Sequence, residues 1–390
     1  MAYQTGTVAN SAALKTVIKD FGVANGWTLT GEFLSKGDIS VKFDTTFQYQ
    51  IFQNTPYNGA NSIGLYITGA STLPGYTVNG YGIYVGDTIT LSGAVPTAYN
   101  GVYTVSAINT PVGSVWQFVT LTVLSGTSFS SNPGNFTTNP TITGEFGTIF
   151  MFGATSADGA TNYLNQGKGI AVLKTYWPLT YHLSANTNPD IIVCTLVYNI
   201  NECQTLIFGN IKKIHDSAFT GGGFYFGTHR LWYGVNGIYT LADNSLLSYG
   251  YSSPLPFIPY TPNSGINIGS SECLHAELDG VVWATRDYGC VLGLTNVCNL
   301  ARSPNTYNSQ THLVPVSIYL QYASGYRGYL GQLEHIRYLR NDNYEVGDII
   351  TIGTDKWKVF PAWKKSITNR SGGSTANSGT LAYAVRYDGP

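Results

Sequence analysis

Apolar and polar residues alternate in short runs along most of the chain. Residues 39–43, 47–51 and 65–67 each place an apolar side chain at every second position. Clusters of Gly, Asn, Pro and Ser separate such runs at intervals of roughly eight to twelve residues. Alternation with a period of two is typical of strands that bury one face. The sequence therefore predicts a mainly β fold of antiparallel β-sandwich domains.

One segment has a helical period instead. Leu14, Val17, Ile18 and Phe21 follow the i, i+3, i+4, i+7 spacing of an amphipathic helix. Asn10 or Ser11 can cap its start, and Gly22 and Gly26 are stop signals. We expect this single N-terminal helix to pack its apolar stripe on the strands that follow it.

A nearly continuous apolar run, I-I-V-C-T-L-V-Y, occupies residues 191–198. A strand without alternation is typical of a position covered on both faces. Residues 204–211 are its expected hairpin partner.

Residues 76–126 are predicted to form a small inserted β module. Its first strand is expected at 85–91, its last at 116–123, and Asn100-Gly101 between them is a type I′ hairpin signal. The phrase V-G-D-T-I-T-L at 85–91 returns as V-G-D-I-I-T-I at 346–352. We attribute this likeness to shared hairpin chemistry, with Gly-Asp leading into a β-branched strand. Three domains are predicted: a helix plus β-sandwich formed by 1–75 with 127–185, the module at 76–126, and a C-terminal β domain at 186–390. The boundary near residue 185 is inferred from the turn sequence N-T-N-P at 186–189.

Low charge is the most informative feature of the composition. Only 11% of the 390 residues are charged, against about 25% in a typical soluble domain, and the net charge is −1. With 45 glycines and 29 tyrosines, the surface must consist largely of neutral polar groups and tyrosine. Such a surface suits a protein packed into an assembly, or one that meets neutral ligands such as sugars.

Several function classes are disfavoured by the same composition. Nucleic-acid binding normally needs a basic patch, and the two lysine clusters, at 212–215 and 356–365, fit solvated faces better than phosphate sites. No apolar run approaches the roughly 20 residues that span a bilayer, so we expect no membrane insertion. The N-terminus lacks the pattern of a secretory signal, and we expect synthesis in a cytoplasm.

The motifs of catalysis and cofactor binding are not found. There is no G-x-S-x-G, P-loop or H-E-x-x-H, and Gly221-Gly222-Gly223 fits a tight turn that lets two backbones approach. His275, Glu277 and Asp279 would share one strand face, as a metal or acid–base cluster or, our preference, as the polar face of a half-buried strand. Five cysteines, Cys194, Cys203, Cys273, Cys290 and Cys298, without a C-x-x-C pair are interpreted as small core residues. We predict no catalytic residue, no cofactor and no metal.

Aromatic side chains on loops are the remaining candidates for function, because Tyr and Trp bind both sugar faces and protein partners. The long loop at 221–268, rich in Gly, aromatic residues and Pro, is expected to form a contact surface. The candidate interaction residues are Trp232, Tyr233, Tyr249, Tyr251, Tyr307, Tyr326 and Tyr329.

Segments spread over most of the chain resemble a family of virion structural proteins of tailed bacteriophages. They are A-Y-Q-T-G-T at 2–7, N-G-W-T at 25–28, W-P-L-T-Y-H-L at 177–183, L-I-F-G-N-I-K-K at 206–213, F-T-G-G at 219–222, G-Q-L at 331–333 through Arg337, K-W-K-V-F-P at 356–361 and S-G-T-L-A-Y-A at 378–384. The module at 76–126 resembles small β modules found within phage tail proteins. The resemblance implies a non-enzymatic part of the virion, at the tail or baseplate, whose partners are other virion proteins and copies of itself. It carries over no catalytic residue.

Three alternatives stay open. The chain could be a receptor-binding or adhesin protein whose aromatics contact host surface glycans, although it shows no long trimeric fibre repeats. It could decorate the capsid rather than the tail. An enzyme such as a polysaccharide depolymerase is the least favoured, because only 21 residues are acidic and no catalytic motif is present.

Overall fold

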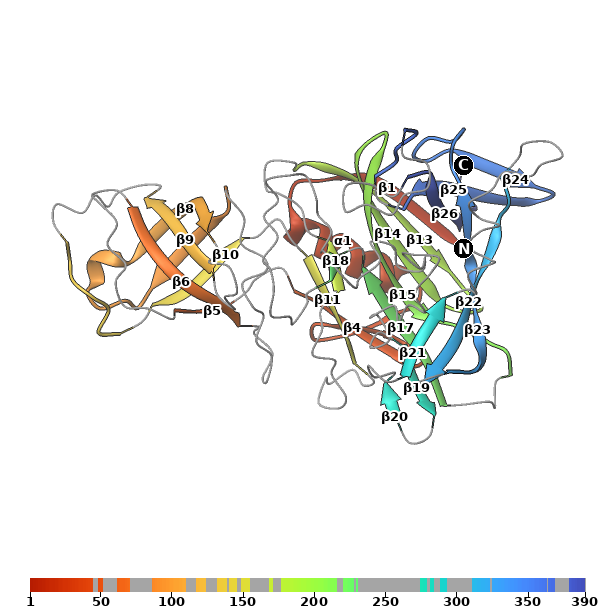
Figure 1. Ribbon diagram of the computed structural model, residues 1–390, viewed down its shortest axis with the longest axis horizontal. Coiled ribbons are helices and arrows are strands. Elements are labelled where there is room, and N and C mark those ends of the chain that lie inside the picture. Colours follow the sequence, from red (N-terminus) through yellow and green to blue (C-terminus); the bar gives the residue numbers. More distant parts are fainter. Residues whose placement is uncertain are drawn as a thin grey trace.

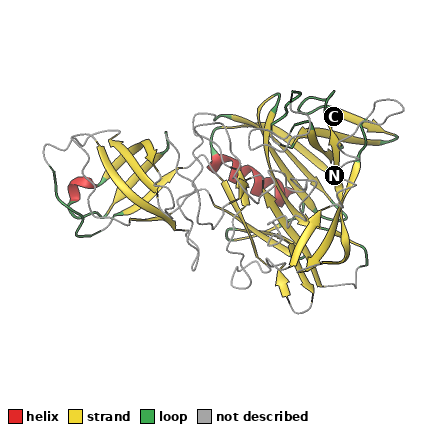
Figure 2. Ribbon diagram, viewed as in Figure 1, coloured by secondary structure: helices red, strands yellow, loops and turns green. Residues whose placement is uncertain are grey.

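The fold is mainly β, with antiparallel sheets and a helix near the N-terminus, so the predicted fold class is confirmed (Figures 1 and 2). The computed structural model describes residues 1–44, 48–51, 62–70, 86–109, 117–123, 132–138, 140–145, 149–154, 168–170, 177–215, 220–227, 229–230, 274–278, 281–283, 288–292, 311–322, 325–362, 364–368 and 379–389. Within them the strands form three open sheets and one closed barrel.

The helix lies where the periodicity predicted it. Helix α1 (Ser11–Ala24) is capped by Asn10, whose side chain accepts a hydrogen bond from the N–H of Ala13 at 2.8 Å. Gly22 lies inside the helix rather than ending it, and a Cβ there would come within 2.5 Å of Leu34. The glycine therefore lets the helix pack closely on strand β3 (Phe33–Lys36), and Gly26, with φ +80°, follows the helix end.

The central sheet joins the N-terminal strand to the middle of the chain. Its order is β1 (Ala2–Val8), β13 (Leu179–Asn186), β14 (Ile191–Asn199), β15 (Glu202–Asn210), β17 (Thr220–Gly227), β19 (Leu274–Leu278) and β20 (Val281–Trp283). The apolar run at 191–198 forms β14, which pairs with β15, and residues 191–196 are all buried. A sheet layer covered on both faces explains this continuous burial.

Two further sheets cover the two faces of the central sheet. On the helix side the order is β18 (His229–Arg230), β12 (Lys168–Ile170), β11 (Ile149–Ala154), β4 (Ile39–Asp44), β3 (Phe33–Lys36) and β2 (Thr28–Thr30). The C-terminal sheet has the order β21 (Tyr288–Leu292), β22 (Val314–Tyr322), β23 (Gly325–Arg340), β26 (Leu381–Arg386), β25 (Asp355–Pro361) and β24 (Ile349–Ile352), with β16 (Lys212–Lys213) also paired to β23.

Side chains of β15 show how the three layers share one core. On one face Phe208 packs edge-on against Trp27 and Phe43, at ring distances of 5.2 and 5.5 Å. On the other face Thr205 and Thr195 form hydrogen bonds with the hydroxyl of Tyr383 from β26. Alternate residues of one strand thus contact the helix-side sheet and the C-terminal sheet.

The barrel lies at one end of the molecule (Figure 1). Its closed order is β10 (Thr141–Glu145), β5 (Gln48–Ile51), β6 (Ser62–Ala70), β9 (Gln117–Val123), β8 (Gly101–Asn109) and β7 (Thr88–Ser92). Only β7, β8 and β9 come from the predicted module 76–126. The central sheet also continues across residue 185, because β13 pairs with β14.

Two turn predictions are wrong. Asn100 has extended backbone (φ −72°, ψ 132°), so no type I′ turn forms at Asn100-Gly101. An eight-residue connection with a 3₁₀ turn (Thr97–Tyr99) joins β7 to β8 instead, and the Asn100 side chain accepts a hydrogen bond from the N–H of Ala94 at 2.8 Å. Residues 221–223 form a bulged part of strand β17, not a turn, although a Cβ at Gly223 would lie 2.4 Å from the Asp38 carbonyl oxygen. The predicted close approach of two backbones is confirmed there.

Candidate functional site

Five of the seven aromatic candidates, Trp232, Tyr233, Tyr249, Tyr251 and Tyr307, lie outside the described residues, as does most of the loop 221–268. Tyr326 and Tyr329 lie on β23, where they pair with Gln321 and Tyr319 of β22. A candidate surface lies instead on the hairpin of β24 and β25, which no motif in the sequence indicated.

The hairpin begins with a backbone motif that the described residues show in two places. Gly347, with φ +88°, donates its N–H to the carbonyl of Val359 at 2.8 Å, and the N–H of Val359 donates to the carbonyl of Asp348 at 2.8 Å. Two residues thus face one, and the first is a glycine with positive φ, which defines a G1 bulge. Gly86 (φ +96°) and Asp87 form the same bulge opposite Val105. The shared hairpin chemistry predicted from the two V-G-D phrases is confirmed.

Strand β24 is the last strand of the C-terminal sheet. It projects from the right-hand side of the molecule in Figure 1, and no described strand pairs with its outer edge. The side chains of Ile349 and Ile352 are 42% and 56% exposed. Residues 349–352 contain neither a charge nor a proline, the usual features that protect an edge strand from pairing.

One face of this hairpin carries the side chains of Ile350, Ile352 and Trp357 and is called its outer face below. It is organised around Trp357, which is only 5% exposed. The guanidinium carbons of Arg337 and Arg386 lie 4.7 and 5.6 Å from the centre of its ring, as cation–π contacts. A terminal nitrogen of Arg386 also forms an ion pair with Asp355. Trp357 packs in a small apolar cluster with Leu339, Val359, Ala382 and Ala384, against which Leu313, Tyr344 and Ile350 also pack.

On the inner face, the chain termini meet the hairpin. The ammonium of Lys358 lies 5.0 Å from the ring centre of Tyr3 and 4.5 Å from that of Tyr387, and these two rings pack edge-on at 4.8 Å. The Tyr3 hydroxyl lies 2.5 Å from Nδ1 of His182 on β13. Burial, together with the nearby charge of Lys358, lowers the pKa of His182 to about 4, so this imidazole is neutral near pH 7.

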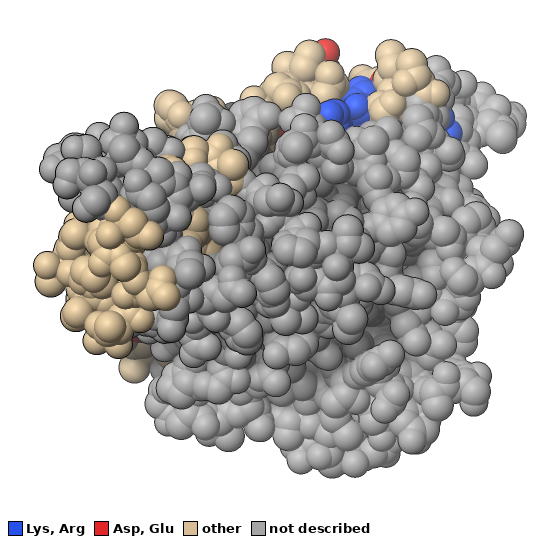
Figure 3. Space-filling model, turned by 60° about the vertical axis from the view of Figure 1, so that its left-hand side comes forward, with Lys and Arg blue, Asp and Glu red and all other residues tan. Residues whose placement is uncertain are grey.

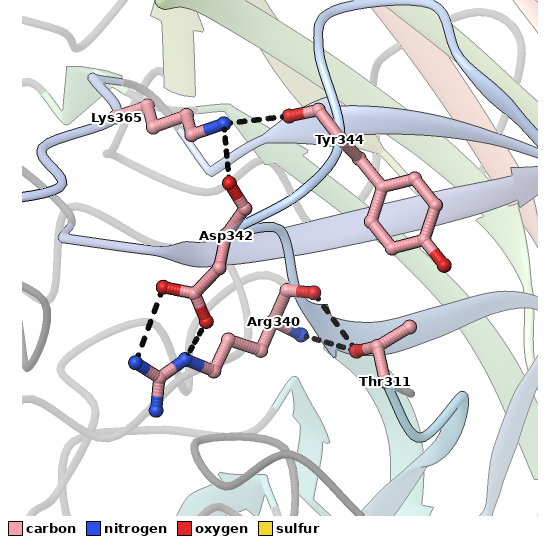
Figure 4. A network of polar contacts seen from close by, with 5 residues as sticks. All are labelled: Thr311, Arg340, Asp342, Tyr344 and Lys365. Carbon is pink, nitrogen blue, oxygen red and sulfur yellow. Dashed lines mark hydrogen bonds and ion pairs between the residues drawn. The ribbon is translucent and has the colours of Figure 1, made fainter. Parts of the chain in front are cut away.

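A polar network fixes the connection that leads from β23 into the hairpin (Figure 4). Thr311 Oγ1 donates to the carbonyl of Arg340 at 2.8 Å and accepts from its N–H at 3.1 Å, and the Arg340 guanidinium forms an ion pair with Asp342. Lys365 Nζ donates to the carbonyls of Asp342 and Tyr344, at 3.3 and 2.7 Å. Five residues from three segments therefore hold the turn that positions β24.

The lysine clusters of the sequence are largely engaged within the chain. Lys212 forms an ion pair with Glu334 and Lys213 with Asp38, and Lys358 and Lys365 make the contacts described above. On the face displayed in Figure 3, basic side chains gather at the upper edge beside acidic ones. The sequence analysis expected solvated faces here, and in the structure these four lysines contact other groups of the same chain.

The cysteines that the structure describes behave as core residues. Cys194 and Cys203 are free and buried, burial raises the pKa of both thiols, and Cys203 donates to the carbonyl of Pro361 at 2.9 Å. Cys273 and Cys298 lie outside the described residues, and only the backbone of Cys290 is described. Among the described residues, no group of three or more His, Cys, Asp or Glu could hold a metal ion. The His275–Asp279 side chains are outside this description.

No protein-family profile matches the chain, and no curated protein matches it either. Within the described part of the chain, no helix has the length and apolar character needed to cross a bilayer.

Proposed function

We propose that this chain is a non-enzymatic structural component of a tailed-phage virion, placed at the tail or baseplate, where it assembles with other virion proteins and copies of itself. The observation that carries this proposal is the open edge of β24, with exposed Ile349 and Ile352 and no protecting charge. Such an edge pairs readily with another strand. In an assembly, a strand of a neighbouring protein would pair with the backbone groups of this edge and cover it.

Composition supports the same conclusion. Interfaces are rich in aromatic residues and poor in Lys, Glu and Asp, and this chain is 14% aromatic and 11% charged. The likeness of its short segments to phage virion structural proteins points to the particle in which such interfaces would form. A long-lived complex would bury much of this surface, which carries few charged side chains.

The proposal is tested by immunogold electron microscopy of purified phage particles with an antibody raised against this chain. We expect label at the tail or baseplate, and none on particles made without this chain. Label on the head would overturn the tail position and favour capsid decoration. If an antibody shown to bind the native protein labels no particle, the virion role is refuted. Release of reducing sugar from host capsule by the purified chain would contradict the non-enzymatic role.

A further inference from the structure

The register of the β24–β25 hairpin determines which backbone groups of β24 are available to a partner. Ile352 faces Asp355 across the two residues Gly353 and Thr354, so this pair closes a two-residue hairpin. In such a hairpin the closing pair exchanges both hydrogen bonds, and every second residue does the same. Ile350 and Ile352 therefore direct their N–H and C=O groups toward β25. Ile349 and Thr351 direct theirs outward.

The outward edge is bounded at both ends. Gly347, before the strand, has φ +88° and belongs to the bulge, and Gly353, after it, has φ +61° and belongs to the turn. Neither has the extended backbone that a ladder requires. A partner strand can therefore pair fully with Ile349 and Thr351 only, which lie symmetrically on either side of Ile350.

Two-fold symmetry selects one register. Facing residues of an antiparallel pair point to the same face, and side chains alternate between faces. Two copies of β24 can thus face each other only when facing residues are both odd or both even. If Thr351 faced itself, Ile349 would face the turn residue Gly353. If Ile349 faced itself, Thr351 would face the bulge residue Gly347. Only the pairing centred on Ile350 uses both outward residues.

We infer, on the basis of the assembly role proposed above, that the partner of this edge is a second copy of the chain, paired antiparallel through β24 about a two-fold axis at Ile350. Ile349 of each copy faces Thr351 of the other, and these two pairs exchange four backbone hydrogen bonds. Ile350 faces its own counterpart. The two C-terminal sheets become one continuous sheet across the axis.

The side chains agree with a second copy as the occupant. In this register Trp357 and Ile350 of one copy lie in line with Ile350 and Trp357 of the other, so the apolar row of the outer face continues across the axis. Asp348 of one copy faces Ile352 of the other copy and not another carboxylate. Lys356 and Lys358 lie on β25, one strand away from the new contact. Like charges that face each other across two strands are destabilising, and this register brings none together.

The register is tested with single cysteines in the full-length chain. Facing residues of a pair that exchanges no hydrogen bonds have Cα atoms about 4.5 Å apart, within the range of a disulfide. Ile350→Cys is expected to cross-link two chains under mild oxidation. Ile352→Cys is the matched control, because this more exposed residue lies about 13 Å from its counterpart along the strands. The unaltered chain gives the background from the natural cysteines.

A backbone variant tests the hydrogen bonds. Thr351→Pro removes an N–H that points away from β25, so the hairpin is expected to keep its fold while losing the partner. Thr351→Val keeps both the N–H and the branched shape. By sedimentation velocity, the mean mass of the unaltered chain and of Thr351→Val should rise above 42.1 kDa with concentration, and that of Thr351→Pro should not. Circular dichroism checks the fold of each variant.

Three results would overturn the inference: no cross-link at Ile350→Cys above the background, cross-linking of Ile352→Cys to the same extent, or association that Thr351→Pro leaves unchanged. These measurements use the purified chain, whereas the virion role is tested on particles. A chain found in the virion that fails the cysteine test would refute the pairing alone. Specific pairing of a chain absent from particles would refute the virion role alone.

Discussion

Replacement of Gly347 by alanine is expected to loosen the start of the β24–β25 hairpin without disturbing the packing around it. The nearest heavy atom to a Cβ at this position is Cε of Lys358, at 3.6 Å, an ordinary van der Waals distance. The side chain therefore has room. The backbone is strained, because φ is +88°, and an L-residue with a side chain pays roughly 1–2 kcal/mol for the left-handed region.

This strain acts on one identifiable hydrogen bond. The N–H of Val359 donates to the carbonyl of Asp348 inside the bulge, at 2.8 Å, so opening of the bulge exposes this amide to exchange. A local destabilisation of about 1–2 kcal/mol corresponds to roughly 5- to 30-fold faster hydrogen exchange. Hydrogen exchange followed by NMR or mass spectrometry over residues 345–359 measures this change, and the amides of the central sheet provide the internal reference.

Gly347→Asn is the matched control, because asparagine tolerates positive φ better than alanine does. It should restore part of the protection that alanine removes. The same pair of substitutions at Gly86 should act on the amide of Val105, because that bulge has the same two hydrogen bonds. Unchanged exchange in Gly347→Ala, or an equal loss with asparagine, would show that φ strain does not control this turn.

Three further outcomes are expected. Trp357→Ala should lower the free energy of unfolding by about 3–5 kcal/mol, because it empties the centre of the apolar cluster on the outer face. A melting temperature equal to that of the unaltered chain would contradict this packing. Tyr383→Phe should destabilise the fold by about 1–3 kcal/mol, since it removes the hydroxyl that forms hydrogen bonds with Thr195 and Thr205. Calorimetry measures this loss of stability, and no loss would argue against these buried hydrogen bonds. The folded-state pKa of His182, lowered to about 4, lies below its ordinary value of about 6.5. The stability that it contributes is therefore present above pH 6.5 and lost as the pH falls toward 4. His182→Gln should flatten that part of the stability profile, and an NMR titration midpoint near 6.5 would refute the shift.

Local patterns in the sequence predicted local structure well. The spacing of Leu14, Ile18 and Phe21 and the cap at Asn10 define α1, and the unbroken apolar run at 191–198 identified a strand buried on both faces. The recurrence of V-G-D identified two hairpins with the same bulge. Each of these features depends on residues close together in the chain, and so a sequence pattern can contain it.

Features that depend on distant strands were not predictable in the same way. The barrel closes through β10, which pairs with both β7 and β5, and nothing within residues 76–126 indicates those partners. Asn100-Gly101 has the composition of a tight hairpin, but the Asn100 side chain bonds to Ala94 within a longer connection. Strand β24, I-I-T-I, has the β-branched composition of any other strand. It is an edge because β26 from the end of the chain pairs between β23 and β25.

The size of the β24 edge limits what it can contribute to an assembly. Four interchain hydrogen bonds, at a net 0.5–1.5 kcal/mol each, supply about 2–6 kcal/mol, whereas association costs at least about 4 kcal/mol in lost translational and rotational freedom. The hydrogen bonds alone therefore only about balance this cost, so the apolar row of Ile350 and Trp357 across the axis must supply the net affinity of the pair. Only a strand already held in shape can form such a pair. The bulge at Gly347, the arginines over Trp357, and Lys358 between Tyr3 and Tyr387 all hold the hairpin before a partner arrives. In a particle, other contacts would keep two copies at a high effective concentration. Under that condition this short edge determines the relative orientation of the copies, and the rest of the assembly adds to the affinity that the edge has by itself.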